Sequence, residues 1–373
     1  MIAHDAGNLV FALSAAFDAL LACVAVWWAA RGERLVPRLA VAAAAVACVL
    51  AVKGLVMVAQ GLSVPFGVMH VVWLDLIVVV PLAALLLLGL VRGRAGATAV
   101  RVTAVAACAL APAGAYASFV EPERLVVERA EIELAPERAG RGSLRVGVLA
   151  DLQFERLGHH EREAVRALVA ERPDVILLAG DYHQGGASSL EQELPGLRRL
   201  LGRLHGPGGV FAVHGDCEGV EEARRVMAGT GVRLLVNDIA RTRVRGRRVT
   251  IAGLERDYWS AAASGAARAL ERTPGSRDVR ILLAHRPDSV SLLEPHSRVD
   301  LVVAGHTHGG QLQLPLYGPP STASSVPREV AAGGLHSLDG RRIYVSRGVG
   351  VERGQAPRLR LGAPPEVSIL ALR

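Results

Sequence analysis

The hydrophobic pattern of the chain changes near residue 120. Before that point the apolar runs are long, at 9–30, 39–59, 68–91 and 98–119. Each has roughly the length that spans a bilayer as a helix. Buried helices of a soluble protein are a poor alternative, because four such runs in succession would need a far larger protein around them. Residues 1–120 are therefore predicted to form an all-α four-helix transmembrane domain.

Beyond residue 143 the apolar runs are short, rich in β-branched residues and flanked by turn residues, as expected of buried strands. They lie at 144–150, 175–179, 209–213, 279–284 and 299–304. Helical periodicity separates the strands, at 160–171, 189–204, 219–229 and 260–272. This alternation predicts an α/β sandwich over 144–373. The charged segment 121–143, which contains two prolines and two glycines, is predicted to be a linker.

Polar residues with metal-binding side chains follow each predicted strand directly. The five junctions are Asp151-Leu152-Gln153, Gly180-Asp181, Gly215-Asp216, His285 and Gly305-His306-Thr307-His308. One such junction is ordinary turn chemistry, since Gly-Asp often follows a strand. Five together are hard to explain that way, because carboxyl ends of strands meet at one edge of a sheet. Carboxylates and neutral imidazoles are common metal ligands, so the pattern predicts a metal site at this edge.

In this order the junctions resemble the motifs of the calcineurin-like metallophosphoesterase superfamily, over roughly residues 144–350. The run GHTHGGQLQLP and the run Tyr344-Val345-Ser346-Arg347-Gly348-Val349-Gly350 are similar to the bacterial branch that is anchored in membranes. The resemblance implies two β-sheets flanked by helices and a pair of divalent metals bridged by Asp181. It also implies the ligands of each metal: Asp151, Gln153, Asp181 and His308 for one, and Asp181, Asp216, His285 and His306 for the other.

Three positions depart from the family pattern: Gln153 and Cys217 stand where His is usual, and Asp216 stands where Asn is usual. Two of these changes add oxygen donors in place of nitrogen or amide groups. The site is therefore expected to favour Mn²⁺, with Mg²⁺, Fe or Zn²⁺ as alternatives. The thiol of Cys217 cannot replace the charge of an imidazolium, so it is either inert, a metal ligand or an acid.

Two neighbours are candidates for the proton donor that Cys217 does not obviously supply. Glu218 follows it directly, and His183 lies two residues after Asp181 and titrates near neutral pH. The competing interpretation of His183 is a solvent-facing loop residue. Arg347 is a candidate for substrate binding through a phosphate, and a structural salt bridge is an equally good interpretation of it.

Two metals held close together would support hydrolysis of a phosphoester by a metal-bound hydroxide. We therefore expect a membrane-anchored phosphatase or phosphodiesterase, acting on a substrate that tethering suggests to be lipid-linked or part of the envelope. Two alternatives stay open. One is a catalytically weakened metal-binding or sensory protein with a degenerate site. The other is a transporter or lipid-binding membrane unit with the phosphoesterase as an accessory.

Charge in the short loops predicts the orientation in the membrane. Arginines lie between the first two spans and between the last two, while the loop at 60–67 carries no charge. By the positive-inside rule the arginine-containing loops are cytoplasmic, so the catalytic domain is expected outside the cytoplasm, anchored in the inner (cell) membrane by several passes. Asp18, Lys53 and Asp75 fall inside the spans and are expected to face the bundle interior or water.

The remaining composition excludes some partners and leaves others open. Aromatic residues make up 4% of the chain, too few for a base-stacking platform, so nucleic acid is not an expected partner. The arginine-rich stretch 241–248 is interpreted as the solvated edge of a β-hairpin, with anionic lipid headgroups as the alternative partner. Three of the four cysteines lie in the spans, which leaves Cys217 without a disulfide partner in the soluble part.

Overall fold

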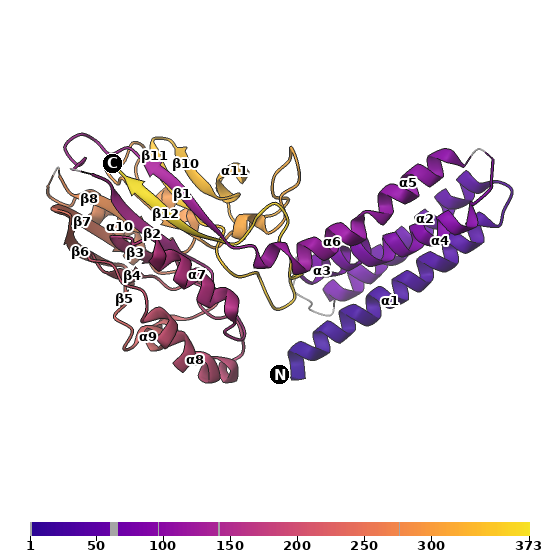
Figure 1. Ribbon diagram of the computed structural model, residues 1–373, viewed down its shortest axis with the longest axis horizontal. Coiled ribbons are helices and arrows are strands. Elements are labelled where there is room, and N and C mark those ends of the chain that lie inside the picture. The colour runs from indigo at the N-terminus through magenta and orange to yellow at the C-terminus, as the bar shows by residue number, and fades with distance from the viewer. Residues whose placement is uncertain (1, 60–65, 96, 141, 276) are drawn as a thin grey trace. The chain divides into compact units, whose positions relative to one another are not determined.

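The computed structural model describes residues 2–59, 66–95, 97–140, 142–275 and 277–373 (Figure 1). The chain forms two compact units. One comprises Met1–Val120 with Glu352–Arg358, and the other comprises Glu121–Val351 with Leu359–Arg373. We describe them as the membrane unit and the catalytic unit.

The membrane unit confirms the four predicted spans. The helices long and apolar enough to cross a membrane include Leu13–Ala30, Leu35–Met57, Phe66–Leu90 and Thr98–Glu123. The loop predicted at 60–67 lies mostly outside the described residues. The helices are α1 (Ile2–Ala30), α2 (Leu35–Ala59), α3 (Phe66–Leu74), α4 (Val80–Leu90), α5 (Thr98–Cys108) and α6 (Leu110–Phe119).

Prolines account for the two breaks within these spans. A π-helical turn, Asp75–Val79, joins α3 to α4, and Pro81 stands in the first turn of α4. Because proline lacks an N–H and its ring crowds the preceding turn, the helix loosens just before it. Pro112 occupies the first turn of α6 in the same way, after the interruption that separates α5 from α6.

Asp18, Lys53 and Asp75 face the interior of the bundle. Asp18 is fully buried and forms an ion pair with Lys53, and Asp75 is buried as well. A charge in hydrocarbon is costly unless it is paired, so the pair accounts for how these residues are tolerated in otherwise apolar helices.

The catalytic unit confirms the predicted sandwich: two six-stranded sheets pack face to face, with helices on their outer faces (Figure 1). The order of the first sheet is β1-β12-β2-β3-β4-β5, and that of the second is β10-β11-β9-β8-β7-β6. The central strands β2–β3–β4–β5 and β11–β9–β8–β7 run parallel. The strands are β1 (Val126–Ile132), β2 (Leu144–Leu149), β3 (Val175–Leu178), β4 (Val210–Ala212), β5 (Arg233–Leu234), β6 (Asp238–Val244), β7 (Arg247–Gly253), β8 (Val279–Leu283), β9 (Leu301–Ala304), β10 (Gly334–Leu338), β11 (Arg341–Val345) and β12 (Glu366–Leu372).

Three apolar cores hold these layers together. The central core lies between the sheets and includes Val148, Leu177 and Ile281. A second core joins the outer face of the first sheet to α7 (His159–Ala170), α8 (Ala187–Leu201) and α9 (Val220–Met227). The third joins the second sheet to α10 (Ala261–Glu271). The parallel strands are buried on both faces, which explains their nearly continuous apolar sequences.

The prediction that 121–143 is a linker is wrong for its central part. Val126–Ile132 form β1, which pairs in parallel with β12 along its whole length. Charged residues alternate with apolar ones in this strand, because it lies at the edge of the sheet and only one of its faces is covered. Its partner β12 lies at the other end of the catalytic unit's sequence, so the local pattern carried little sign of a strand.

The arginine-rich stretch 241–248 lies in the hairpin formed by β6 and β7, as expected. Arg241 and Arg243 are exposed on β6, which is an edge strand of the second sheet. Arg247 is instead buried, and its guanidinium donates to the carbonyl of Leu372 at 3.0 Å. This arginine ties the hairpin to the last strand of the first sheet.

Candidate metal centre

The candidate ligands come from the carboxyl ends of five parallel strands, three in the first sheet and two in the second. β2 leads to Asp151, β3 to Asp181, β4 to Asp216, β8 to His285 and β9 to His306. Because the two sheets pack face to face, these ends meet at one edge of the sandwich. The structure therefore brings together side chains that lie up to 155 residues apart.

Asp216, His285 and His306 form the first group with ligand atoms close enough to hold a cation. Their ligand atoms all lie within 4.8 Å of one another. Oδ2 of Asp216 lies 2.9 Å from Nδ1 of His306 and 3.5 Å from Nε2 of His285. One carboxylate and two imidazoles form a mixed donor set that suits Mn²⁺, Fe²⁺ or Zn²⁺.

Asp151, Asp181 and His285 form a second group, whose ligand atoms also lie within 4.8 Å of one another. Nε2 of His285 is 3.4 Å from Oδ2 of Asp181, and Nδ1 is 3.9 Å from Oδ1 of Asp151. All three side chains are buried. The two groups share His285, so they adjoin each other.

The hydrogen bonding of His285 shows that a metal ion fits this cluster. Its Nδ1 donates to the carbonyl of Ala179 at 2.7 Å, which leaves the lone pair on Nε2. This nitrogen is buried, faces Asp181 and Asp216, and has no hydrogen-bond partner among the described residues. A buried acceptor without a donor is costly, and a cation bound between it and the carboxylates would satisfy it.

The charges in the cluster support the same conclusion. Burial raises the pKa of the Asp151 carboxyl, and the nearby Asp181 raises it further, to about 7 although His285 opposes the shift. Burial lowers the pKa of His285, but Asp181, Asp216 and Asp151 outweigh burial and raise it to about 10. Without a metal, the cluster holds protons because its negative charges are concentrated in a dry site. Divalent cations would replace those protons.

The backbone around the ligands is strained in a consistent way. Asp151, Gln153, Asp181, His306 and His308 all have positive φ, between 38° and 73°. The left-handed region is unfavourable for residues with a Cβ and persists where the surroundings enforce it, commonly at functional sites. Sharp turns after the strands thus direct these side chains back towards one another.

Two glycines make the close approach of the loops possible. A Cβ on Gly215 would lie 2.0 Å from Oδ1 of Asp181, and a Cβ on Gly305 would lie 2.5 Å from Oδ2 of Asp151. Any side chain at these positions would occupy the space of a ligand carboxylate. These glycines therefore belong to the construction of the site.

Gln153 and His308 adjoin the two groups without belonging to them. Nε2 of Gln153 donates to Oδ2 of Asp181 and to Sγ of Cys217, both at 3.2 Å. Because a cation binds the amide oxygen, the amide would have to turn over to act as a ligand. His308 is buried, and Nε2 of its ring has no hydrogen-bond partner among the described residues. Burial and Arg360 hold its pKa well below the usual range, which keeps the imidazole neutral, as ligation requires.

The candidate acids His183, Cys217 and Glu218 line one small cavity of about 20 Å³ beside the cluster. The carboxyl oxygens of Glu218 accept hydrogen bonds from the backbone N–H groups of Asp181 (3.0 Å), Tyr182 (3.1 Å) and Gly215 (2.8 Å). Burial and the neighbouring Asp181 raise the pKa of Glu218 to about 8. Its geometry is that of a clamp between the loops that follow β3 and β4.

His183 is buried, which removes the interpretation of a solvent-facing loop residue. Its Nε2 lies 3.1 Å from Oγ of Ser189, which donates to the carbonyl of Glu155. Since that hydroxyl proton is already used, Nε2 of His183 donates to Ser189 and the ring is turned towards α8. Its edge packs against Phe154, with the ring centroids 5.4 Å apart.

Arg347, the candidate for substrate binding, is engaged in ion pairs within the fold. Its guanidinium contacts Glu366 on β12 at 2.5 Å and Glu128 on β1 at 2.9 Å. The structure therefore favours the structural interpretation of this arginine, which joins the loop after β11 to the first sheet.

Two residues at the site were not identified from the sequence. Arg286 forms a salt bridge to Asp216 at 2.6 Å, and its only signal was its position directly after His285. His214 is buried, and its Nε2 accepts from the backbone N–H of Arg256 at 3.3 Å. Burial lowers its pKa. Its signal was its place at the end of β4, directly before Gly215-Asp216.

Comparison with known proteins agrees with this geometry. Residues 144–310 match the model of the family described as calcineurin-like phosphoesterase. The phosphodiesterase YaeI of Escherichia coli (strain K12) is 29% identical over 262 residues, which are 69% of this chain and 92% of that protein. The uncharacterized metallophosphoesterase YkuE of Bacillus subtilis (strain 168) is 28% identical over 285 residues, which are 72% of this chain and 94% of that protein. The UDP-2,3-diacylglucosamine pyrophosphatase LpxG of Chlamydia muridarum (strain MoPn / Nigg) is 33% identical over 99 residues, which are 24% of this chain and 28% of that protein.

Proposed function

Because residues 144–310 belong to the calcineurin-like phosphoesterase superfamily, we propose that this chain is a membrane-anchored, metal-dependent hydrolase of phosphoric esters. One observation carries the proposal. Three carboxylates and two imidazoles from five strands lie with their ligand atoms in two adjoining groups. Such a cluster of like charges is unfavourable by itself, and a pair of divalent cations would stabilise it.

A pair of cations bound there would supply an activated water and neutralise charge on the phosphoryl oxygens. The chain's own residues would hold and orient that pair. The carbonyl of Ala179 fixes the tautomer of His285, and Glu218 fixes the loops that carry Asp181 and Asp216. Arg286 holds the Asp216 carboxylate through two nitrogens. This orientation of ligands by their neighbours is typical of metal sites.

The ligand chemistry favours Mn²⁺ as the native metal. Asp216 adds a carboxylate, and Gln153 offers an amide oxygen once its side chain turns over, so the site is rich in oxygen donors. Oxygen donors suit Mn²⁺ and Mg²⁺ better than Zn²⁺. Fe and Zn²⁺ remain compatible with the imidazoles of His285 and His306.

For the substrate we propose a phosphoester with a good leaving group, located in or near the membrane. One relative is named as a phosphodiesterase, and another as a pyrophosphatase of UDP-2,3-diacylglucosamine. The four apolar helices of this chain are long enough to cross a membrane, and such an anchor would keep the catalytic unit near a lipid surface. Without an imidazole at position 217 to protonate the leaving group, esters whose leaving groups need little protonation should react best.

The test is hydrolysis of an aryl phosphodiester, bis(p-nitrophenyl) phosphate, by the purified full-length protein in detergent. The protein is stripped with a chelator and reloaded with Mn²⁺. Asp181→Asn should lower kcat/KM by at least about 100-fold, because it removes a ligand carboxylate. The matched control is Glu131→Gln on the edge strand β1, whose carboxylate is exposed and pairs only with Arg373 among the described residues. Equal activity of the Asp181→Asn variant and the wild type would refute the proposal.

A second candidate function is a metal-binding or sensory protein that has lost turnover. The observation that favours it is the contact between Gln153 and Cys217, two positions where the family pattern has His. The two candidates differ in the same assay. A sensory protein would bind Mn²⁺ stoichiometrically, lose that binding in Asp181→Asn, and show no metal-dependent hydrolysis in either form.

A further inference from the structure

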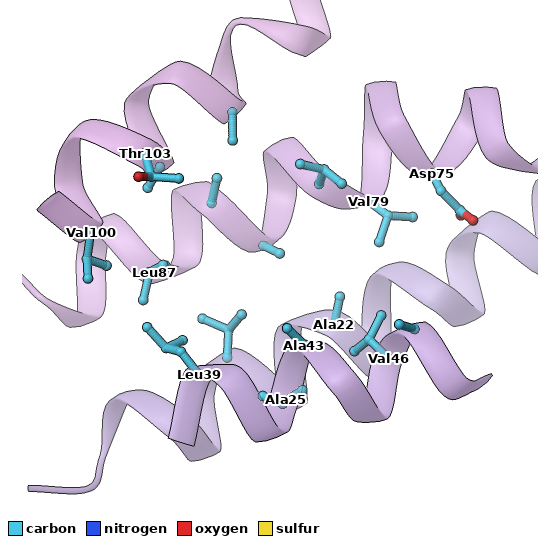
Figure 2. A pocket seen from close by; sticks show the side chains of 18 of the residues that line it. Ala22, Ala25, Leu39, Ala43, Val46, Asp75, Val79, Leu87, Val100 and Thr103 are labelled. Carbon is cyan, nitrogen blue, oxygen red and sulfur yellow. The ribbon is translucent and has the colours of Figure 1, made fainter. Parts of the chain in front are cut away.

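An apolar cavity of about 680 Å³, open to the surface of the bundle, lies between α1, α2, α4 and α5 of the membrane unit (Figure 2). This volume falls within the range of small-molecule sites. Figure 2 shows Leu39, Ala43 and Val46 of α2 on one side of it and Val79, Leu87 and Val100 on the other. Only two of the residues that line it carry polar side chains, Asp75 and Thr103.

Alanines create this cavity. Ten of the lining residues are alanine: Ala22, Ala25, Ala42, Ala43, Ala47, Ala83, Ala84, Ala99, Ala104 and Ala107. Small side chains usually let membrane helices approach closely. Here α2 packs on α1, α5 packs on α4, and α1 packs on α4. Between these packed pairs the short alanine side chains do not fill the gap, which leaves the cavity.

A second pocket, of about 700 Å³, adjoins the apolar cavity at one end of the bundle. It lies between the loop that joins α1 to α2 and the loop that joins α4 to α5. The two pockets share the lining residues Val36 and Val100. The second one is basic: Arg31, Arg34 and Arg94 line it, and Glu33 is its one acidic lining residue.

The three arginines keep their charges available. Within the described part of the chain, none of them forms a salt bridge to a carboxylate. Arg31 lies over the ring of Trp27 at 4.1 Å, and Arg94 donates to the carbonyl of Gly32 at 3.4 Å. Arg31 and Arg34 are exposed. Cation–π and carbonyl contacts orient a guanidinium without neutralising it, so the pocket attracts anions.

We propose that the membrane unit binds an anionic phospholipid, with its phosphate in the arginine pocket and an acyl chain in the alanine-lined cavity. A free anion would leave the apolar cavity unfilled, and an uncharged lipid would leave the arginines without a counter-charge. Basic pockets between membrane helices bind anionic headgroups at the cytoplasmic side. Both loops belong to the end that the positive-inside rule assigns to the cytoplasm.

The residues that line the proposed lipid site all belong to the membrane unit. The chain leaves the membrane unit after α6, which runs on from α5 away from the arginine-containing loops. The proposed site is therefore at the end of the bundle opposite to that exit. It requires no phosphoesterase activity and would survive failure of the proposed function.

The headgroup is tested on the delipidated full-length protein in detergent. Phosphatidylglycerol or phosphatidylcholine with matched acyl chains is added, and binding is followed by native mass spectrometry and by thermal unfolding. We expect preferential retention of phosphatidylglycerol and a larger rise in Tm with it. Equal binding of the two lipids by the wild type would overturn the proposal.

Matched variants locate the phosphate and the acyl chain. Combined substitution Arg31→Gln, Arg34→Gln and Arg94→Gln should weaken binding of phosphatidylglycerol by roughly 100-fold. Arg92→Gln, in the same loop as Arg94 but outside the pocket, should leave binding unchanged. For the acyl chain, Ala43→Leu with Ala104→Leu should reduce retention of both lipids, and Ala45→Leu on an exposed face of α2 should not. Undiminished preference in the triple arginine variant would refute the headgroup site, and undiminished retention in the cavity variant would refute the chain site.

Discussion

Arg286 and Asp216 form an ion pair in which one guanidinium holds both carboxylate oxygens. Nη2 of Arg286 lies 2.6 Å from Oδ1, and Nε lies 3.1 and 3.2 Å from Oδ1 and Oδ2. The pair is mostly buried. Burial raises the pKa of Asp216, but the neighbouring His285, His306 and Arg286 outweigh burial and hold this pKa far below its usual range. The carboxylate that replaces an amide in the family pattern thus comes with a compensating cation.

This pairing predicts opposite effects of two substitutions on metal affinity. Arg286→Gln should tighten Mn²⁺ binding, because it leaves the Asp216 charge uncompensated, and Asp216→Asn should weaken it. The double variant should lie near Asp216→Asn, because the arginine acts through the charge of the Asp216 carboxylate, so the two effects should be non-additive by about 1 kcal/mol or more. Titration calorimetry with Mn²⁺ measures all four proteins. Weaker Mn²⁺ binding by Arg286→Gln would show that the arginine does not act through charge compensation.

Stability of the metal-free protein should fall as the pH rises from 7 to 9. The folded-state pKa values of Glu218 (about 8) and His285 (about 10) lie above their ordinary values. Groups with raised pKa values stabilise the fold while protonated and lose this contribution as pH rises through the folded value. Asp216 does not contribute in this window, because its pKa is lowered and titrates at acid pH.

Calorimetry of the chelated protein at pH 7, 8 and 9 checks this dependence. We expect Tm to fall by about 5 °C or more. Saturating Mn²⁺ should raise Tm at each pH and reduce the slope, because cations replace the protons. A Tm that is independent of pH in the chelated protein would contradict the raised pKa values.

Glu218 is predicted to act as a structural clamp. Glu218→Ala leaves three buried backbone N–H groups without a hydrogen-bond acceptor, and each such group costs about 1–3 kcal/mol. The unfolding free energy measured in denaturant should drop by about 3 kcal/mol or more. Glu221→Ala is the control, since Glu221 is exposed on the adjacent α9. If the clamp variant were as stable as that control, the three hydrogen bonds would not support the site.

Restoring the imidazole of the family pattern should change the preference for leaving groups. Cys217→His is expected to raise kcat/KM for an alkyl phosphodiester by about 10-fold or more, with a smaller effect on the aryl ester. An acid matters more when the leaving group is basic, which explains the difference. Cys217→Ala serves as the control for removal of the thiol. Equal gains on both esters would point to an effect on metal binding instead.

Orientation in the membrane follows from the arginines of two loops and is tested by fusions at the C-terminus. We predict that alkaline phosphatase fused there is active and that a fluorescent protein requiring the cytoplasm is dark. A fusion placed after Arg34 should show the reverse pattern. Fluorescence from the C-terminal fusion would place the catalytic unit in the cytoplasm.

The strand ends and their polar residues were predictable from the sequence, because both are local. Val175–Leu178 is a continuous apolar run and Asp181 follows it within three residues. The strand and the metal-binding residue at its end can therefore both be identified from one short stretch of sequence. The four spans were predictable for the same reason, since a helix satisfies its own backbone and only its length and apolar character matter. The two sheets came from resemblance to a family.

Pairings between distant segments were decided by the tertiary structure. β1 became a strand only by pairing with β12, Arg347 found its partners on those two strands, and Arg286 met Asp216 70 residues away in the chain. Hydrogen bonds and ion pairs depend on distances of a few ångströms between groups that the chain order separates. Hydrophobic patterning determines which segments are buried, whereas packing determines which polar groups meet once they are there.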